Sequence, residues 1–272
     1  MPKEPSFLSQ PEPWDLVAEG YATTTMPMFR PYAEVAIESL GVSATGKVLD
    51  VACGPGTATL LLAKKACEVH AIDFSAEMLA ILDEKIKIEK HLNIYPQFGD
   101  GQAMPFKDES FDAAVSMFGL MFFPDRYKGF SELYRILRAH GRIAVTSWAP
   151  VSQSPAMQIM FGALHVINPD LPEPKMAIDS LENPEQFEKE MQEAGFHQIK
   201  VQRVRKEFPV VSVADFWSAM VTGSAPIRMM KQVMSAQLWQ EKERLALAYL
   251  EKELSHEPEA LCSDAWLGTG VK

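Results

Sequence analysis

Cysteine is scarce in this sequence, and its few copies show no metal-binding or redox spacing. Cys53, Cys67 and Cys262 are the three cysteines among 272 residues, and no two of them form a C-x-x-C pair. This spacing excludes a disulfide framework and a zinc site built from cysteine pairs, and the odd number suits a reducing compartment. We therefore expect three small apolar residues in the interior rather than a catalytic thiol.

Long apolar segments and an excess of basic residues are also missing. The longest apolar stretch, residues 113–123, has 11 residues and includes Ser116 and Gly119, whereas a membrane-spanning helix needs about 20. The start, Met1–Pro5, lacks the apolar core of a secretory signal, which predicts a cytoplasmic protein. With 26 basic and 36 acidic residues, a net charge of −10 and a pI near 5.2, the sequence argues against a nucleic-acid partner.

What the sequence does contain is a regular alternation of strand and helix patterns. Apolar runs predict strands and 3.6-residue periodicity predicts helices. The expected strands are 47–52, 68–72, 94–98, 111–117 and 142–148, and the expected helices between them are 57–65, 75–90 and 126–138. This order predicts an α/β fold, with a mainly parallel, doubly wound sheet that has helices on both faces.

The remaining segments predict a helical cap and two insertions. Residues 14–40 have a helical pattern in two pieces, with Pro31 suited to the first turn of the second piece. The segment after Pro150 contains several prolines, which disfavour a long helix. Further expected elements are a helix over 185–194, strands over 196–204 and 265–271, and helices over most of 213–254. We expect a tail and cap over 1–46 and a single domain over 47–272, with insertions at 150–182 and 212–260.

A glycine-rich turn follows the first expected strand, in the sequence VLDVACGPGTA over residues 48–58. Such a turn presents a nucleotide-like ligand at the carboxyl edge of a parallel sheet. Dinucleotides and nucleosides such as S-adenosylmethionine both bind there, and they differ in the pyrophosphate. A dinucleotide site has the pattern G-x-G-x-x-G, but here Thr59 replaces the third glycine and Pro55 has no N–H donor. The turn therefore favours a nucleoside and leaves a dinucleotide open.

Carboxylates follow three successive strands. Asp50 ends the first strand, where it would repel a pyrophosphate and accept hydrogen bonds from an ammonium group. Asp73 ends the second and is placed for two hydrogen bonds from ribose hydroxyls. Asp100 follows the third, where it would receive an adenine amino group. A single carboxylate of this kind often only caps a turn, but three in this combination indicate a binding site.

These motifs resemble class I S-adenosylmethionine-dependent methyltransferases, close to the branch that contains quinone-biosynthesis C-methyltransferases. The similarity covers residues 21–148 through VLDVACGPGT, AIDFS, GDGQAMPF, FDAAVSMFGL and LRAHGRIAVTSW, and the ending DAWLGTGVK resembles the last strand of that family. The resemblance implies a Rossmann-like, seven-stranded sheet of order 3-2-1-4-5-7-6 with its last strand antiparallel. It also implies S-adenosyl-L-methionine as cofactor and S-adenosyl-L-homocysteine as product.

Carried over by position, the resemblance implies a cofactor site and no metal. Asp50 and the backbone of residues 52–54 would hold the methionine moiety, Asp73 the ribose, and Asp100 with Gly101 the adenine edge. The expected cofactor-binding residues are Tyr21, Asp50, Ala52, Cys53, Gly54, Gly56, Asp73, Phe74, Met78, Asp100, Gly101, Gln102, Met117 and Phe118. Ala52 stands where the family has its first glycine, and Gly101 stands where alanine is common; we expect neither departure to abolish binding.

The acceptor pocket is expected to be apolar and to use the cap, residues 118–123 and the insertion after Trp148. Its expected residues are Met28, Phe29, Met121, Phe122 and Trp148, with Met26, Met117, Phe123, Met157, Met160 and Phe161 as further candidates. An acceptor that must lose a proton needs a base. The candidates are Tyr21, His140, His165 and His197, while Arg30 and Arg126 are candidates for contacting an anionic group, although surface solvation is the commoner role of such arginines.

The sequence thus predicts a methyltransferase that acts on a small, partly apolar molecule by in-line transfer to oxygen or carbon. Catalysis would come mainly from positioning, because alignment of two reactants alone lowers a barrier by roughly 7–11 kcal/mol. Two alternatives stay open, a methyltransferase-like protein that binds the cofactor without turnover and an NAD-dependent oxidoreductase. A methyltransferase of nucleic acid would require a basic face.

Overall fold

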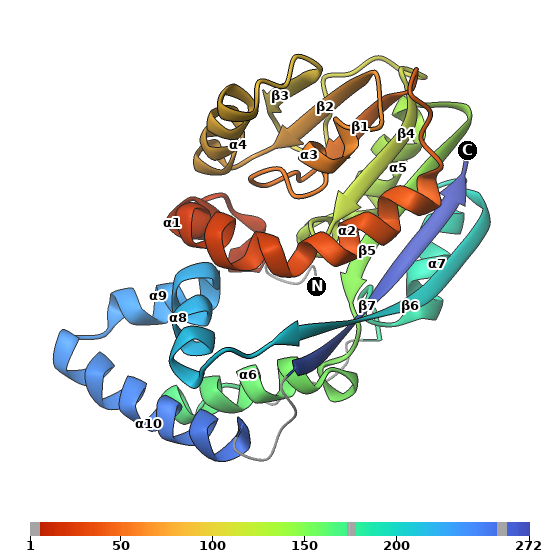
Figure 1. Ribbon diagram of the computed structural model, residues 1–272. Helices are drawn as coiled ribbons and strands as arrows, with labels where there is room; N and C mark the ends of the chain where they lie inside the picture. Colours follow the sequence, from red (N-terminus) through yellow and green to blue (C-terminus); the bar gives the residue numbers. More distant parts are fainter. Residues whose placement is uncertain (1–5, 173, 175–177, 255–259) are drawn as a thin grey trace.

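The computed structural model describes residues 6–172, 174, 178–254 and 260–272, and its centre is a seven-stranded sheet (Figure 1). The strands are β1 (Lys47–Val51), β2 (Glu68–Asp73), β3 (Ile94–Phe98), β4 (Phe111–Met117), β5 (Leu137–Trp148), β6 (His197–Pro209) and β7 (Ala260–Val271). Their order, β3-β2-β1-β4-β5-β7-β6, is the predicted one. The strands β1 to β5 pair in parallel, and β7 runs antiparallel to both of its neighbours.

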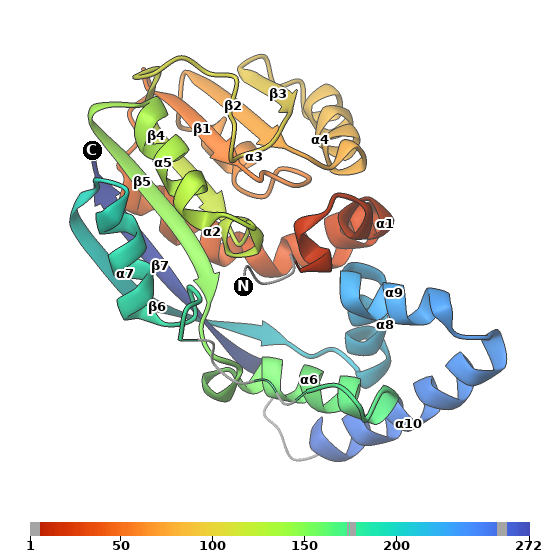
Figure 2. The ribbon, with the colours of Figure 1, turned by 180° about the vertical axis from the view of Figure 1, so that it is seen from behind.

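Helices cover both faces of this sheet, as the alternating sequence pattern predicts. The helices α2 (Met26–Leu40), α3 (Thr59–Leu62) and α4 (Ala76–Glu89) lie on one face, and α5 (Arg126–Ile136) and α7 (Pro184–Glu193) lie on the other (Figures 1 and 2). Because side chains alternate along a strand, Val48 belongs to the same buried cluster as Tyr32 of α2, whereas Leu49 belongs to the same cluster as Leu133 of α5. The two apolar layers are therefore built from alternate residues of the same strands.

A separate group of helices stands beyond the carboxyl ends of the parallel strands. It consists of α6 (Pro155–Ile167), α8 (Val213–Gly223), α9 (Ala225–Val233) and α10 (Ala236–Leu254). These helices have their own apolar core, in which Ile159, Trp217, Trp239 and Leu250 are buried. Figure 2 shows this group below the sheet, with the ends of β6 and β7 reaching toward α6. The segments expected as insertions thus form a second wall next to the sheet edge.

The N-terminal cap lies between the sheet and this helical group. It consists of α1 (Glu12–Gly20) and a π-helical turn, η2 (Tyr21–Thr25), that continue into α2 (Figure 1). Thr24 Oγ1 donates to the carbonyl of Ala219 at 3.4 Å, and a Cβ on Gly223 would overlap the hydroxyls of Thr24 and Thr25. The absence of a side chain on Gly223 therefore lets α8 approach the cap closely.

Two expectations about proline were wrong. Pro155 begins α6 instead of preventing a helix, because a proline in the first turn has no intrahelical hydrogen bond to lose and Ser154 precedes it in extended conformation. Pro31 lies inside α2, since Pro27 takes the first-turn position that we expected for Pro31. The helix continues through Pro31 at the loss of one N–H donor.

Other boundaries differ by a few residues. The helix α3 is shorter than the expected 57–65, α5 ends at Ile136 because β5 already begins at Leu137, and β6 and β7 are both longer than expected. Within the described part of the chain, no helix combines the length and apolar character needed to cross a membrane.

Candidate functional site

A cavity of about 480 Å³ opens at the carboxyl ends of the parallel strands, between the sheet, the cap and the helical group. Most residues expected to bind cofactor line it. They are Tyr21, Ala52, Gly54, Asp73, Phe74, Met78, Asp100, Gly101, Gln102, Met117 and Phe118. The residues expected in the acceptor pocket, Met28, Phe29, Met121, Phe122 and Trp148, line the same cavity. The structure therefore brings both predicted sets together in one space.

Four of the expected site residues lie behind this wall or away from it. Asp50, Cys53 and Gly56 are buried next to the turn and are not part of the cavity lining. Burial, together with the negative charges of Asp73 and Asp50, raises the pKa of the Cys53 thiol, so this cysteine stays protonated. The expectation of three interior cysteines was wrong for the other two, because Cys67 is exposed and Cys262 is half-buried. His165 lies on α6, where its ring nitrogens face the carbonyls of Phe161 and Leu171, and it does not line the cavity either.

The glycine-rich turn depends on backbone angles that suit glycine. Gly54 and Gly56 have φ of +54° and +93°, and Ala52 has φ of +55°. The first glycine of the family pattern therefore falls on a left-handed position, where alanine costs free energy that glycine avoids. Gly119 faces this alanine, and a Cβ on Gly119 would collide with the Cβ of Ala52. A glycine at 119 accommodates the extra methyl group at 52.

Asp73 is held in one orientation by the backbone around it. Its Oδ2 accepts a hydrogen bond from Gly54 N at 2.7 Å, and its Oδ1 accepts one from Ser75 N at 2.9 Å. Burial raises the pKa of Asp73 to about 6, while these backbone N–H groups oppose the shift. Each carboxylate oxygen can accept more than one hydrogen bond, so the group can still receive ligand hydroxyls.

Asp50 is almost completely buried beneath the turn. Its hydrogen-bond partner is Thr59, the residue that replaces the third glycine of the dinucleotide pattern. Thr59 Oγ1 donates to Asp50 Oδ2 at 2.6 Å, whereas Asp50 Oδ1 has no partner among the described residues. Burial raises the pKa of Asp50 to about 7, and the charge of Asp73 adds to this effect. The carboxylate thus acts on the site through charge and through the turn, without forming its wall.

The third predicted carboxylate, Asp100, is exposed at the rim of the cavity. Its Oδ1 accepts hydrogen bonds from the backbone N and the side-chain Nε2 of Gln102, at 2.8 and 3.1 Å. Next to it, a Cβ on Gly101 would lie 2.6 Å from the ring of Phe123 and 2.9 Å from Val51 Cγ1. The ring of Phe123 therefore explains why this chain has glycine where alanine is common.

Tyr21 enters the cavity from the cap. Burial raises the pKa of its phenol, and the nearby charge of Asp73 raises it further. A tyrosine with a raised pKa is a poor proton acceptor at neutral pH, so the expectation that Tyr21 is a candidate base is not supported by its surroundings. Its hydroxyl group is suited to donating a hydrogen bond instead.

Asp15 of α1 attaches the cap to the start of α4, next to Asp73. Asp15 Oδ1 accepts hydrogen bonds from Ser75 Oγ at 2.5 Å and from Glu77 N at 3.3 Å, both at the start of α4. A carboxylate at a helix N-terminus is favoured by the helix dipole. Trp14, one residue earlier, lines the cavity and packs on Phe122 with ring centroids 5.2 Å apart. The position of α1 is therefore tied to the residues that follow Asp73.

Aromatic rings form the wall on the β4 and β5 side. Phe118 stacks on Trp148 with ring centroids 4.2 Å apart and an interplanar angle of 29°, and Phe29 contacts both rings. Phe118 has φ of +56°, a left-handed conformation that is uncommon for a bulky residue. The bend after β4 therefore turns this ring toward Trp148 at the end of β5.

Several cavity residues were not predicted. They are contributed by β6, α8 and β7 and by the segment before α7, and include Glu182, Phe208, Phe216, Met220 and Ser263. No local motif marks these residues, because they reach the cavity only through the β6–β7 pairing and the packing of α8 on the cap. Of the further methionine candidates, Met157 and Met160 line the cavity, whereas Met26 does not.

The remaining candidate bases and cations lie elsewhere. His140 donates its backbone N–H to the carbonyl of Lys272, and His197 pairs with Val271, so both lie at the amino edge of the sheet. No histidine among the described residues lines the large cavity. Arg126 binds Glu190 through two nitrogens, at 2.9 and 2.6 Å, and Arg30 pairs with Glu34 on the surface of α2. Neither arginine lines the cavity.

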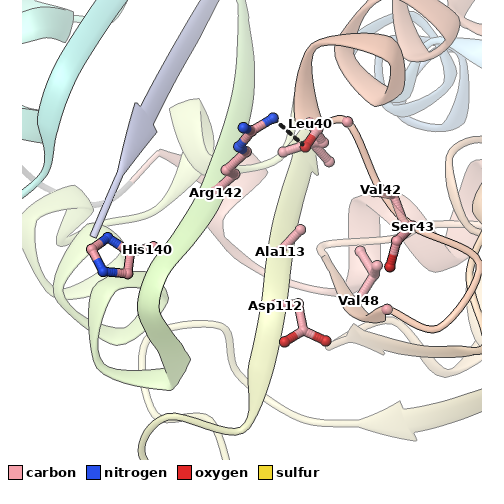
Figure 3. Close-up of a pocket in the computed structure, with 10 residues that line it drawn as sticks. Leu40, Val42, Ser43, Val48, Asp112, Ala113, His140 and Arg142 are labelled. Carbon is pink, nitrogen blue, oxygen red and sulfur yellow. Dashed lines mark hydrogen bonds between the residues drawn. The ribbon is translucent and has the colours of Figure 1, made fainter.

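A second, smaller hollow of about 150 Å³ lies at the amino edge of the sheet, next to the end of α2 (Figure 3). Arg142 Nη1 donates to the carbonyl of Leu40 at 3.3 Å, and Asp112 Oδ2 accepts from Lys47 N at 2.8 Å. These polar groups hold the end of α2 and the start of β1. Ligands of parallel α/β sheets bind at the opposite edge, so the larger cavity is the candidate site.

Comparison with known proteins agrees with this geometry. A family model for a methyltransferase domain matches residues 48–141. The ubiquinone/menaquinone biosynthesis C-methyltransferase UbiE of Citrifermentans bemidjiense is 34% identical over 124 residues, which are 44% of this chain and 53% of that protein. The aligned part thus spans about half the length of this relative.

Solved structures share the fold. The YcgJ protein of Bacillus subtilis superposes with a TM-score of 0.59 at 17% identity, covering 88% of this chain and 97% of that one. Phosphoethanolamine N-methyltransferase 2 of Haemonchus contortus, in complex with phosphomonomethylethanolamine and S-adenosylhomocysteine, superposes with a TM-score of 0.55 at 21% identity, covering 89% of this chain and 52% of that one.

The matched family model identifies a methyltransferase domain over residues 48–141, and the strand order is that of the class I S-adenosylmethionine-dependent methyltransferase fold. Within that class, the chain is distantly similar to the UbiE-type C-methyltransferases.

Proposed function

We propose that this protein transfers the methyl group of S-adenosylmethionine to a small, largely apolar acceptor. The observation that carries the proposal is that one cavity runs from the carboxylates Asp73 and Asp100 to the stacked rings of Phe118 and Trp148. One end of the cavity offers the hydrogen-bonding groups that a nucleoside requires. The other end offers the apolar and aromatic surface typical of small-molecule pockets.

The polar end fits S-adenosylmethionine. Asp73 would accept hydrogen bonds from the ribose hydroxyls, Asp100 and the backbone at Gly101 would face the adenine edge, and the turn at residues 52–54 would face the methionine moiety. Asp50 has a buried oxygen without a partner just beneath this turn. Two buried carboxylates in one region favour a ligand that carries positive charge.

When bound, S-adenosylmethionine would supply an electrophilic methyl group to an acceptor that attacks in line. The bond between methyl and sulfur would break, and its electron pair would stay on sulfur. The chain's own contribution would be alignment and exclusion of water. Phe118 and Trp148 would orient the acceptor, and Trp14 and Tyr21 of the cap would cover the cofactor. Such alignment can lower a barrier by roughly 7–11 kcal/mol.

The residues at the acceptor end of the cavity limit the kind of acceptor that the protein could methylate. Tyr21 stays protonated, and no described histidine lines the cavity. Transfer to an acceptor that ionises readily, such as a phenol or an enolisable carbon, needs the least help from a base. We therefore propose O- or C-methylation of an acceptor of this kind.

The test is incubation of the protein with methyl-labelled S-adenosylmethionine and a metabolite extract, followed by mass spectrometry. Asp73→Asn removes the proposed ribose ligand, and Asp83→Asn on the exposed side of α4 is the matched control. We expect labelled product with the wild type and the control, and much less with Asp73→Asn at a cofactor concentration that does not saturate the variant. Tight binding of S-adenosylhomocysteine without any labelled product would favour the alternative of a cofactor-binding protein without turnover.

A further inference from the structure

Ser263 has a buried hydroxyl group with no hydrogen-bond partner in the wall of the large cavity. The residue is 2% exposed, and its Oγ contacts no donor or acceptor among the described residues. Four side-chain atoms of the described chain share this condition, belonging to Asp50, Ser116, Trp239 and Ser263. Only Ser263 lines the cavity. Buried hydroxyls are nearly always hydrogen-bonded, so one beside a cavity points to a ligand atom as its missing partner.

The position of Ser263 places it at the acceptor end. In the β5–β7 ladder Trp148 pairs with Ala265, so Ser263 lies two residues beyond the carboxyl end of β5. The strands β1, β4 and β5 separate β7 from β2, which ends in Asp73. Four strand spacings amount to about 19 Å. A ribose bound at Asp73 therefore lies far from Ser263, and a ligand that meets its hydroxyl must come from the other end of the cavity.

The main chain around Ser263 is rigidly held. Tyr32 OH donates to the carbonyl of Ser263 at 2.7 Å, and Asp264 N donates to Ser154 Oγ at 2.9 Å. The buried Asp264 carboxylate pairs with Arg203 and Arg205 of β6. These contacts involve the carbonyl of Ser263 and the neighbouring residue. They leave the Ser263 hydroxyl without a partner, on a backbone that is already ordered.

The surroundings of Ser263 are apolar. Tyr32, which binds its carbonyl, packs against Phe208 and Trp148 with ring centroids 6.1 and 5.8 Å away. Phe208 and Trp148 both line the cavity. In an apolar pocket a single hydrogen-bonding group fixes the orientation of a ligand, because a ligand without a matching group leaves the buried hydroxyl unpaired.

We propose that Ser263 is a specificity-determining residue that binds a hydroxyl or carbonyl oxygen of an otherwise apolar, ring-containing acceptor. The proposal rests on the proposed function, since it names the contact that orients the acceptor of the methyl transfer. The stacked rings of Phe118 and Trp148 hold the flat face of the acceptor, and Ser263 sets the direction of its oxygen substituent. This contact selects oxygenated acceptors over hydrocarbons of the same shape.

The probes are 2-naphthol and 2-methylnaphthalene, which have nearly the same shape and differ in the oxygen. Their binding is measured by calorimetry in the presence of saturating S-adenosylhomocysteine. The variants are Ser263→Ala and, as matched control, Ser116→Ala, which removes another unpartnered buried hydroxyl outside the cavity. We expect the wild type and Ser116→Ala to prefer 2-naphthol about three- to tenfold, and Ser263→Ala to bind both probes equally.

The proposal is overturned if the wild type binds neither probe or does not prefer 2-naphthol. It is also overturned if Ser263→Ala keeps the preference for 2-naphthol. Thermal unfolding of the ligand-free variants gives an independent readout. A buried hydroxyl without a partner lowers the stability of the fold, because it loses its hydrogen bonds to water, so Ser263→Ala should melt at the wild-type temperature or above, and a lower melting temperature contradicts the proposal. Binding of S-adenosylhomocysteine is measured separately, and its absence from the wild type would contradict the proposed function itself.

Discussion

The backbone N–H of Gly54 donates a hydrogen bond of 2.7 Å to Oδ2 of Asp73. This bond joins the glycine-rich turn after β1 to the end of the neighbouring strand β2. Ser75 N holds the other carboxylate oxygen, so the orientation of Asp73 is fixed by two backbone donors. A carboxylate that is oriented before the ligand arrives loses little conformational freedom on binding. The glycine turn thus positions a side chain of the candidate site.

The buried Asp50 makes the stability of the ligand-free protein depend on pH. Its pKa is about 7 in the folded state against a usual value of 3.8, so the folded state binds this proton more tightly than the unfolded state. The contribution of Asp50 to the free energy of unfolding therefore falls as the pH rises from about 4 to 7. Asp50→Asn removes this titration. The quantity to compare is the free energy of unfolding of Asp50→Asn minus that of the wild type. This difference should be larger at about pH 8 than at about pH 4.5, by at most about 4 kcal/mol.

Urea unfolding at both pH values measures this difference, with Asp83→Asn as the exposed control. A difference between Asp50→Asn and wild type that does not change with pH would show that Asp50 titrates normally.

Cofactor affinity should also depend on pH through Asp73. Burial raises the pKa of Asp73 to about 6, and its ionised form is the better acceptor for two ribose hydroxyls. Affinity for S-adenosylhomocysteine should therefore rise about tenfold between about pH 5 and pH 7 and then level off. Calorimetric titration across this range measures the change. Affinity that falls with increasing pH would mean that the protonated carboxyl is the binding form.

Gly101 and Phe123 should behave as a coupled pair. A Cβ on Gly101 would lie 2.6 Å from the Phe123 ring, so Gly101→Ala should destabilise the fold by about 1–3 kcal/mol. A second substitution, Phe123→Leu, provides room for the methyl group. The double variant should then be less destabilised than the sum of the two single changes, which a double-mutant cycle of unfolding free energies measures. Additive effects would mean that Val51, the other neighbour, causes the clash.

The contact between the cap and α4 should support both stability and binding. Asp15→Ala removes the acceptor for Ser75 Oγ and Glu77 N, which should lower the free energy of unfolding by about 1–2 kcal/mol. It should also weaken binding of S-adenosylhomocysteine, since α1 carries Trp14 over the cavity. Glu12→Ala, an exposed acidic residue in the first turn of the same helix, is the control. Unchanged affinity in Asp15→Ala would show that the cap does not cover the cofactor.

The parts of the fold that were predictable from sequence are those with local signals. The strands β1 to β4 are short apolar runs next to turns, and Asp73 and Asp100 could be placed because parallel strands all end at one edge. Helix α6 has no clear sequence signal, because Pro155 disfavours a helix interior, yet the extended Ser154 before it allows this proline to start a helix.

The parts of the site that could not be predicted depend on partners distant in sequence. Thr59 was recognised as a missing glycine, but its bond to Asp50 becomes visible only in three dimensions. Arg126 was considered for an anionic substrate, whereas it is paired with Glu190, 64 residues away. The motif DAWLGTGVK, which begins one residue after Ser263, predicted the antiparallel last strand, but it did not indicate that Ser263 enters the cavity wall.

The central claim, that this cavity binds the methyl donor, is tested most directly by calorimetry. S-adenosylhomocysteine is titrated into the wild type, Asp73→Asn and Asp83→Asn, and NAD is titrated in parallel. Loss of a charge-assisted hydrogen bond should weaken binding by about 10- to 100-fold in Asp73→Asn. The wild type and Asp83→Asn should bind with equal affinity at one site, and NAD should produce no binding heat. Equal affinity of Asp73→Asn and wild type, or binding of NAD in place of S-adenosylhomocysteine, would contradict the account.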